Sequence, residues 1–168
     1  RGKVKEQLNL TSQAQSDLER SIKLLPTADA YNSLGNLATK AGRLAEAKDY
    51  YAKVANNQSE LGKQAYRALL DLDLKDNPAK YVNVRIGQNS QGEIVAQITN
   101  PTPQNIHQIT LIVQYKDATG RTQQIKHNLK GTVTAGKQHL FDLGLTGKLT
   151  PEQFKTLQAG ITGAQVAR

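Results

Sequence analysis

The sequence predicts a two-domain α + β protein, in which a tandem array of α-helical hairpins is followed by an antiparallel β-sandwich. Up to about Asp73, apolar residues recur at spacings of three and four, which is typical of one face of a helix. Beyond the turn-forming segment 76–78, apolar residues alternate every second position, which is typical of strands. We therefore expect helical repeats with a capping helix over residues 1–77 and the β-sandwich over residues 79–168.

The charge is unevenly distributed between the two halves. The 168 residues carry a net charge of +8, and residues 79–168, with ten basic and four acidic residues, account for +6 of it. These basic residues are dispersed, whereas a nucleic-acid-binding surface usually clusters them and interleaves aromatic residues. We expect a solvated basic surface. An anionic partner such as a phospholipid, a polysaccharide or a nucleic acid is the alternative.

The chain contains no cysteine, which excludes disulfides, thiolate nucleophiles and zinc fingers. Together with abundant Gln, Asn and Thr, this composition is typical of bacterial envelope proteins, and we expect a periplasmic or cell-envelope location. No run approaches the roughly 18 apolar residues of a membrane span, and no signal-like segment opens the chain. Because Arg1 falls within a helical pattern, we expect any signal or anchor to lie upstream.

The helical half repeats itself at a shift of 33 residues. The pairs that this shift superposes are Asn9 with Gly42, Ala14 with Ala47 and Leu18 with Tyr51. A repeat of this length predicts stacked helical hairpins, because each hairpin buries its apolar face against the next.

The second repeat shows why each unit forms a hairpin. Gly35 and Ala38 lie on the apolar face of its first helix, where small residues let a second helix approach. Gly42 is placed to end the first helix, as glycine commonly does. The second helix is expected over about residues 44–54, with Tyr51 filling the gap between the helices.

This pattern closely resembles the tetratricopeptide repeat (TPR), in which a large residue, Leu-Gly and a small residue are followed by glycine, alanine and an aromatic residue. The resemblance covers residues 1 to about 75. Its second repeat, at about residues 28–59, is nearly complete, the first lacks its opening turns, and a lone capping helix follows at about residues 59–73. The chain thus resembles the C-terminal fragment of a TPR protein, with further repeats upstream. An unrelated helical bundle is the alternative.

The resemblance implies a superhelix whose concave wall, lined by the first helices, binds other proteins. Carried onto this chain, the groove-facing positions give the candidate peptide-binding residues Lys3, Asp29, Asn32, Asn36, Lys40, Lys63 and Tyr66. Asn32 and Asn36 stand one turn apart, so we expect both amides to reach an extended peptide backbone. The alternative is a polar helix face that meets only water.

The β half predicts six or seven short strands without interleaved helices, which favours an antiparallel sandwich. The strands are expected over residues 81–86, 93–99, 109–115, 122–129, 139–143 and 157–166. One or two helical turns are expected to start after Thr150, because proline follows it and Gln153 stands at the capping-box position. Phe154 in those turns is expected to cover an open end of the sandwich.

Several turn and strand residues of this half resemble the FxLYD-type immunoglobulin-like domains of bacterial envelope proteins. They are a strand that ends in Asn100, the alternation of residues 109–115 that leads into Asp117 and Gly120, and the Ala-Gly turn 135–136. The resemblance implies an immunoglobulin-like β-sandwich over residues 79–168 that serves as a spacer or docking domain.

No catalytic, metal-binding or cofactor-binding motif is visible. His107, His127 and His139 have no metal-ligand spacing, and we expect each to be hydrogen-bonded or solvent-facing. There is no phosphate-binding glycine loop and no Gly-x-Ser-x-Gly motif. We therefore predict that the chain is not an enzyme and uses no catalytic residue, metal or cofactor.

These observations predict a non-catalytic protein- or peptide-binding adaptor or scaffold of the bacterial cell envelope. Its partner is expected to be a protein or peptide, including the remainder of its own polypeptide. Two alternatives stay open. The chain could be the accessory C-terminal region of a larger envelope enzyme, or its basic β-sandwich could bind an anionic polymer or a membrane surface.

Overall fold

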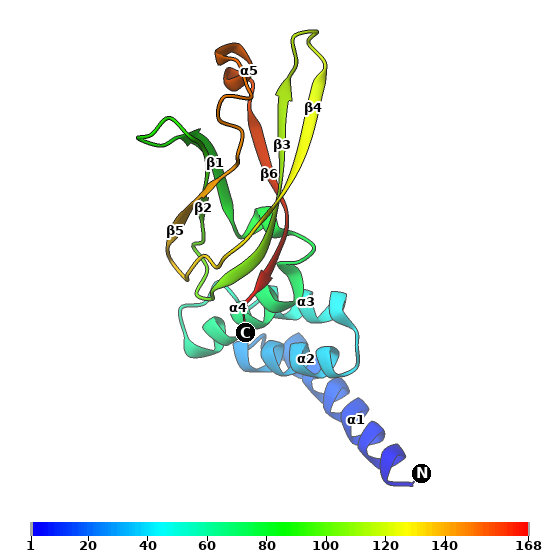
Figure 1. Cartoon of the computed structure of the whole chain (residues 1–168). Coiled ribbons are helices and arrows are strands. Elements are labelled where there is room, and N and C mark those ends of the chain that lie inside the picture. Colours follow the sequence, from blue (N-terminus) through cyan, green and yellow to red (C-terminus); the bar gives the residue numbers. More distant parts are fainter. Residues whose placement is uncertain (1, 168) are drawn as a thin grey trace. The chain divides into compact units, whose positions relative to one another are not determined.

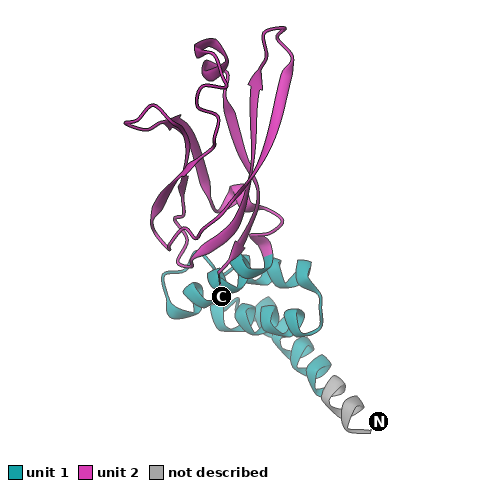
Figure 2. Ribbon diagram, in the orientation of Figure 1, with its two compact units in different colours: residues 1–72 teal, residues 73–168 magenta. Residues whose placement is uncertain are grey.

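The structure is a computed structural model that describes residues 2–167, with side chains described from Leu10 onward. Its contacts divide the chain into two compact units, residues 1–72 and residues 73–168 (Figure 2). The first unit is helical and the second contains two antiparallel sheets, so the predicted two-domain α + β fold class is confirmed. The two units are described separately below.

Helices α1 (Gly2–Leu24), α2 (Ala28–Lys40), α3 (Leu44–Ala52) and α4 (Glu60–Asp73) make up the first unit, apart from the last residue of α4 (Figure 1). Local sequence sets their ends. Thr27 caps α2, since its hydroxyl oxygen accepts a hydrogen bond from the Ala30 N–H at 3.3 Å. Gly42, with φ +74°, adopts the left-handed conformation that turns the chain from α2 into α3.

The first repeat differs from the prediction. The shift of 33 residues places a turn at Asn9, but α1 runs without a break from Gly2 to Leu24. Asn9 lacks the glycine that produces the turn at Gly42, and no proline or glycine interrupts residues 3–24. Asparagine costs a helix only about 0.7 kcal/mol relative to alanine, so a continuous helix is the simpler outcome.

Helices α2 and α3 cross at a small residue, as predicted. A side-chain carbon at Gly35 would lie only 2.5–2.9 Å from three ring carbons of Tyr51, so the ring occupies the space that a side chain would need. Tyr51 is 2% exposed and belongs to the core of this unit. The buried members of that core are Ala38, Ala47, Tyr51, Val54, Ala65 and Leu69.

The second unit begins with an ordered segment at the predicted breaker. Asp73 is only 5% exposed. Its carboxylate accepts hydrogen bonds from the Asn77 amide and the Tyr81 hydroxyl, both at 2.8 Å, and forms an ion pair with Lys80 at 3.3 Å. These donors hold the chain through the 3-10 turn Pro78–Lys80. One buried carboxylate thus fixes the path into the first strand.

Two three-stranded antiparallel sheets follow, in the orders β1-β2-β5 and β4-β3-β6. The strands are β1 (Asn83–Gln88), β2 (Ile94–Thr99), β3 (Ile106–Lys116), β4 (Thr122–Leu129), β5 (Gln138–Asp142) and β6 (Gln158–Val166). Each predicted strand is present, with ends that differ from the prediction by at most three residues. The sandwich core combines residues of both sheets, among them Ile98, Leu111 and Val113, each fully buried.

Buried Asn100 secures the two segments that cross between the sheets. Its amide nitrogen donates to the carbonyl oxygens of Gln104 at 2.8 Å and Val133 at 3.0 Å. Its amide oxygen accepts from the N–H of Thr102 at 3.1 Å and from the Thr102 hydroxyl at 2.7 Å. Crossing segments leave the sheets and lose their ladder partners, so the side chain of Asn100 supplies the hydrogen bonds that strands would otherwise provide.

The short helix predicted after Thr150 is confirmed as α5 (Pro151–Lys155). Both hydrogen bonds of the capping box form, from the Gln153 N–H to the Thr150 hydroxyl oxygen at 3.3 Å and from the Thr150 N–H to Gln153 Oε1 at 2.9 Å. Phe154 is half-buried beside Ile94 and Leu149.

His127 is half-buried, and its Nε2 alone departs from the expectation of a hydrogen-bonded or solvent-facing histidine. It lies on the inward side of β4, between Ile125 and Leu129, and opposite Leu111 of β3. Its Nε2 is buried and has no hydrogen-bond partner among the described residues. Burial lowers the pKa of His127, because the charged form is less well solvated inside the sandwich.

The β3–β4 hairpin is held by Asp117, and this gives a pH-dependent prediction. Hydrogen bonds from the side chains of Thr119 and Gln123, and then from the Arg121 and Thr119 N–H groups, lower the pKa of Asp117 to about 2. An unfolded aspartate has a pKa of about 3.9. The folded value is depressed, so the stabilisation is complete above about pH 4 and is lost as pH falls through about 2.

We expect the amide NMR signals of Thr119 and Arg121 to titrate together with a midpoint near pH 2, and Asp117→Asn to abolish that titration. A midpoint near 4 in the parent protein would mean that these hydrogen bonds do not hold the carboxylate.

Candidate functional site

Four of the sequence-predicted site residues lie on α2, spaced by three or four residues. Asp29, Asn32, Asn36 and Lys40 therefore form one stripe along the helix. Asp29 lies in the first turn and Lys40 in the last, which places a negative charge at the positive end of the helix dipole and a positive charge at its negative end. The stripe spans about 17 Å at 1.5 Å per residue.

Asn36 is held by a residue of the neighbouring helix. The Tyr51 hydroxyl passes the crossing at Gly35 and donates a hydrogen bond to Asn36 Oδ1 at 2.7 Å. It also lies 3.4 Å from the Thr39 hydroxyl, which donates to the Gly35 carbonyl oxygen at 2.9 Å. The bond to Tyr51 occupies the oxygen end of the exposed Asn36 amide, so the nitrogen end remains for donation to a ligand.

Asn32 occupies a different environment from its neighbour. It is 7% exposed, although it lies on the same stripe as exposed Asn36. Its amide is therefore mostly enclosed, and of the two amides expected to reach a peptide backbone only that of Asn36 is exposed. Sequence spacing indicates which residues share a helix face, but it does not show what covers that face.

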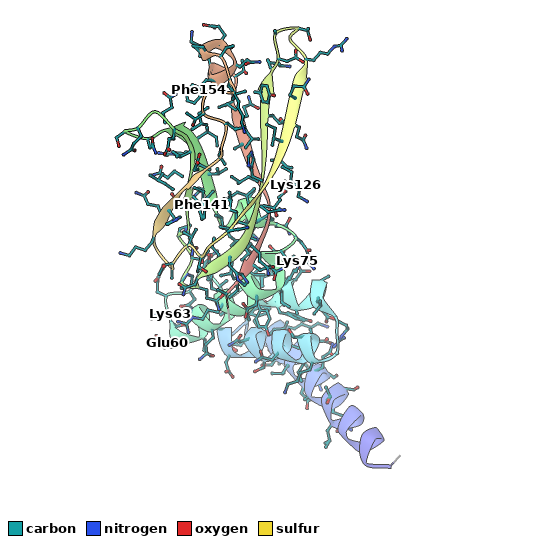
Figure 3. The ribbon with its side chains drawn as sticks, viewed as in Figure 1. Glu60, Lys63, Lys75, Lys126, Phe141 and Phe154 are labelled. Atoms are coloured by element: carbon teal, nitrogen blue, oxygen red, sulfur yellow. The ribbon has the colours of Figure 1, made fainter. Side chains whose placement is uncertain are left out.

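The remaining predicted residues lie outside α2. Lys63 and Tyr66 stand one turn apart on α4, where exposed Lys63 forms an ion pair with Glu60 at 2.6 Å and Tyr66 is half-buried. Figure 3 labels Lys63 and Glu60 on this helix. The side chain of Lys3 lies outside the described residues. Whether these residues share one surface with the α2 stripe stays a prediction.

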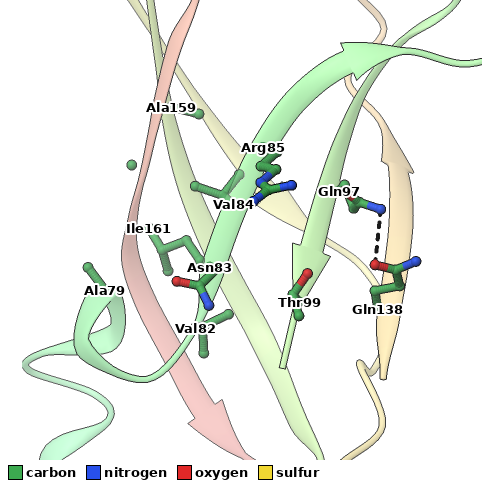
Figure 4. Close-up of a pocket in the computed structure, with 11 residues that line it drawn as sticks. Ala79, Val82, Asn83, Val84, Arg85, Gln97, Thr99, Gln138, Ala159 and Ile161 are labelled. Atoms are coloured by element: carbon green, nitrogen blue, oxygen red, sulfur yellow. Dashed lines mark hydrogen bonds between the residues drawn. The ribbon is translucent and has the colours of Figure 1, made fainter. Parts of the chain in front are cut away.

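The second unit contains a separate hollow of about 460 Å³ at the β1 edge of its first sheet (Figure 4). Asn83 and Arg85 of β1 and Thr99 of β2 provide polar lining, and the Gln97 amide donates to the Gln138 side chain at 3.0 Å. Its apolar part comes from residues such as Val84, Ala159 and Ile161. The strand pattern indicated these elements, but it did not indicate this hollow.

Within residues 2–167, no helix is both long and apolar enough to cross a bilayer. Among the residues whose side chains are described, from Leu10 onward, no group of three or more acidic, histidine or cysteine side chains is arranged to hold a metal ion.

Comparison with known proteins identifies the repeat on which the stripe lies. Residues 28–59 match the family model of the tetratricopeptide repeat, so the chain contains such a repeat at α2 and α3. No curated protein matches the sequence. Among solved structures, the trimeric lipoprotein SadB of Salmonella enterica is similar at 12% identity and a TM-score of 0.35, over 99% of this chain and 92% of that chain. A TM-score of this size does not establish a shared fold.

Proposed function

We propose that the chain is a non-catalytic adaptor of the bacterial cell envelope that binds an extended peptide segment of a partner protein along α2. The tetratricopeptide repeat at residues 28–59 supports protein–protein interaction in general. The cysteine-free composition, rich in Gln, Asn and Thr, supports the envelope location.

The observation that carries the finer proposal is the hydrogen bond from Tyr51 to Asn36. An amide held at its oxygen end presents its N–H groups in a fixed direction, which suits donation to a peptide carbonyl oxygen. Because the side chain is already ordered, binding loses less conformational entropy than it would with a free rotamer. The repeat thus uses its gap-filling tyrosine both for packing and for orienting a recognition group.

The charges at the two ends of the stripe indicate the direction of the bound segment. Lys40 favours an acidic residue or a free carboxylate, and Asp29 favours a basic residue, so the segment is expected to place these charges at opposite ends. A stripe of about 17 Å matches five residues of extended chain at about 3.3 Å each. The preferred ligand is therefore a short, extended segment with an acidic end beside Lys40.

This proposal predicts that Asn36→Ala and Lys40→Ala weaken peptide binding. Peptides selected from a random library against the full chain are titrated by calorimetry into the parent and the variants. Each variant is expected to lose about 1 kcal/mol of binding free energy, which is roughly a fivefold weaker Kd.

The matched controls are Arg121→Ala and Lys126→Ala, which remove exposed charges from the second unit. If these controls weaken binding while the α2 variants do not, the peptide site lies on the β-sandwich and the proposal is wrong. A further variant, Tyr51→Phe, removes the hydroxyl that holds Asn36 and is expected to weaken binding about as much as Asn36→Ala.

A further inference from the structure

The outward positions of β3 and β4, from Thr110 onward, are polar except at Ile112. The inward positions are Ile109, Leu111 and Val113 of β3 and Ile125, His127 and Leu129 of β4, so the even-numbered residues between them point outward. Cross-strand hydrogen bonds order them in pairs: Thr110 to Asn128 at 3.1 Å, Gln114 to Gln124 at 3.2 Å and Lys116 to Thr122 at 2.7 Å. We call this surface the polar face. Its hydroxyl and amide groups are held in fixed positions before any ligand arrives.

The polar face carries positive charge and, among the described residues, no carboxylate. Lys116 and Lys126 stand on it and Lys130 follows at the end of β4 (Figure 3 labels Lys126). The four acidic residues between positions 79 and 168 lie at other places. Asp117 is at the tip of the β3–β4 hairpin, and the other three are Glu93, Asp142 and Glu152. Lys130 is four positions beyond Lys126, which is about 13 Å for extended chain.

A hollow of about 470 Å³ lies at one end of the polar face. A register shift between His107 and Thr110 breaks the β3–β6 ladder there, and Gln108 has a φ of 51°, which is uncommon for a residue other than glycine. Such bulges redirect a side chain and open a sheet locally. Gly163, opposite Thr110, leaves the floor of the hollow free of a side chain.

The lining of this hollow combines cations with neutral polar groups. Lys75 and Lys130 line it together with Thr110 and Asn128. Asp76 follows Lys75 in the sequence but does not line the hollow. Its volume is within the range of about 300–1,000 Å³ that is typical of small-ligand sites.

We propose that the hollow and the polar face bind an anionic polysaccharide, with one acidic sugar in the hollow and the polymer continuing along the strands. Ordered amides and hydroxyls suit sugar hydroxyl groups, because each offers both donor and acceptor capacity. Lysines about 13 Å apart suit a polymer with sparse charges. They match poorly with a nucleic acid, whose single strand carries a phosphate about every 3.4 Å.

The remaining features of the face also favour a polysaccharide. Its outward positions on β3 and β4 carry no aromatic residue on which a base could stack. Half-buried Ile112 is the one apolar residue at those outward strand positions from Thr110 onward, which gives a lipid bilayer little surface to bind. This site lies on another unit than the α2 stripe, so either proposal can fail without the other.

The experiment titrates an oligomer of hyaluronan, in which charged glucuronic acid alternates with an uncharged sugar, into the full chain and follows amide NMR signals. The same oligomer with its carboxylates methyl-esterified is the uncharged control. We expect the acidic oligomer to shift the signals of Thr110, Asn128 and Gly163 at millimolar concentration or below, and the ester to bind more weakly. Lys126→Gln and Lys130→Gln are each expected to weaken binding about two- to fivefold.

Two further variants separate this site from general charge attraction. Gly163→Val fills the floor of the hollow without changing charge and is expected to weaken binding at least tenfold. Its first side-chain carbon would lie 3.4 Å from the Thr110 side chain, so the signals near Thr110 should shift while those of the rest of the sandwich are preserved. Lys148→Gln removes an exposed lysine of the loop between β5 and α5, which does not line the hollow, and is expected to leave binding unchanged. Equal losses for Lys148→Gln and Lys130→Gln, or no loss for Gly163→Val, would overturn the proposal. Binding to anionic phospholipid vesicles or single-stranded DNA in place of the oligomer would also overturn it.

Discussion

Asn100→Asp is expected to lower the free energy of unfolding by about 3–5 kcal/mol at neutral pH, the cost of leaving a buried charge uncompensated. The substitution keeps the shape of the side chain and its two bonds from Thr102. It replaces the amide nitrogen, however, with an oxygen that faces the carbonyl oxygens of Gln104 and Val133 at 2.8 and 3.0 Å. Asn100 is fully buried, so water cannot screen the repulsion.

The pH dependence of the stability of Asn100→Asp shows whether the loss comes from the introduced charge or from a change in packing. When the introduced carboxyl group is protonated, it donates one hydrogen bond and carries no charge. Burial and the two carbonyl oxygens therefore raise its pKa above the unfolded value of about 3.9. The stability of the variant is then highest below that unfolded pKa and is lost as pH rises through the folded pKa.

Urea unfolding followed by NMR signals of Ile98 and Leu111 should show the variant approaching the parent as pH falls toward 3. Exposed Asn128→Asp, the matched control, should change stability by about 0.5 kcal/mol or less. A loss in Asn100→Asp that is equal at pH 3 and pH 7 would show that packing and not charge is responsible.

The prediction from sequence succeeded where the determining interactions are local. The turn at Gly42 depends on one residue that tolerates positive φ, and the α5 cap depends on Thr150 and Gln153, three positions apart. The strands after Pro78 follow from their own alternation. In each case the residues that decide the structure are neighbours in the chain, so their pattern is visible in the sequence.

The prediction from sequence failed where the deciding contact is distant in the chain. It also failed where a pattern was transferred from one repeat to another that lacks the residue on which the pattern depends. The break expected at Asn9 came from an alignment with Gly42, although asparagine does not force a turn. The polar strand β4 gave no sign that His127 points inward, because its alternation is masked by polar residues on both faces. Likewise, nothing in the sequence indicated that Asp73, at the end of the helical pattern, binds Tyr81 inside the second unit.

At the candidate site, too, local features were predictable from the sequence and distant contacts were not. Helical spacing correctly placed Asp29, Asn36 and Lys40 on one stripe of α2. The bond that orients Asn36 comes from Tyr51, fifteen residues away, and the sequence suggested only a packing role for that ring. The proposed recognition surface therefore depends on the whole hairpin, and a change in its packing should affect binding as well as stability.

Gly35→Leu is the strongest test of that coupling between packing and the site. The first side-chain carbon alone would lie 2.5 Å from the Tyr51 ring, and the remaining carbons of leucine need space that α3 occupies. Overpacking of this kind costs about 1–3 kcal/mol, and we expect the upper end because Tyr51 is 2% exposed and has no room to move. Displacing the ring also withdraws the hydroxyl from Asn36, so peptide binding should weaken in the same variant.

Two comparisons identify the Tyr51 ring as the cause. Gly160→Leu places leucine at a glycine with no atom within 4 Å of the added carbon and should have a much smaller effect on stability. In the double variant Gly35→Leu/Tyr51→Ala the leucine can enter the space that the ring leaves, so the loss should be smaller than the sum of the two single losses by at least about 1 kcal/mol. Urea unfolding followed by helical circular dichroism measures all of these variants beside the parent. Strictly additive losses would show that Gly35 and Tyr51 do not share the helix crossing described here.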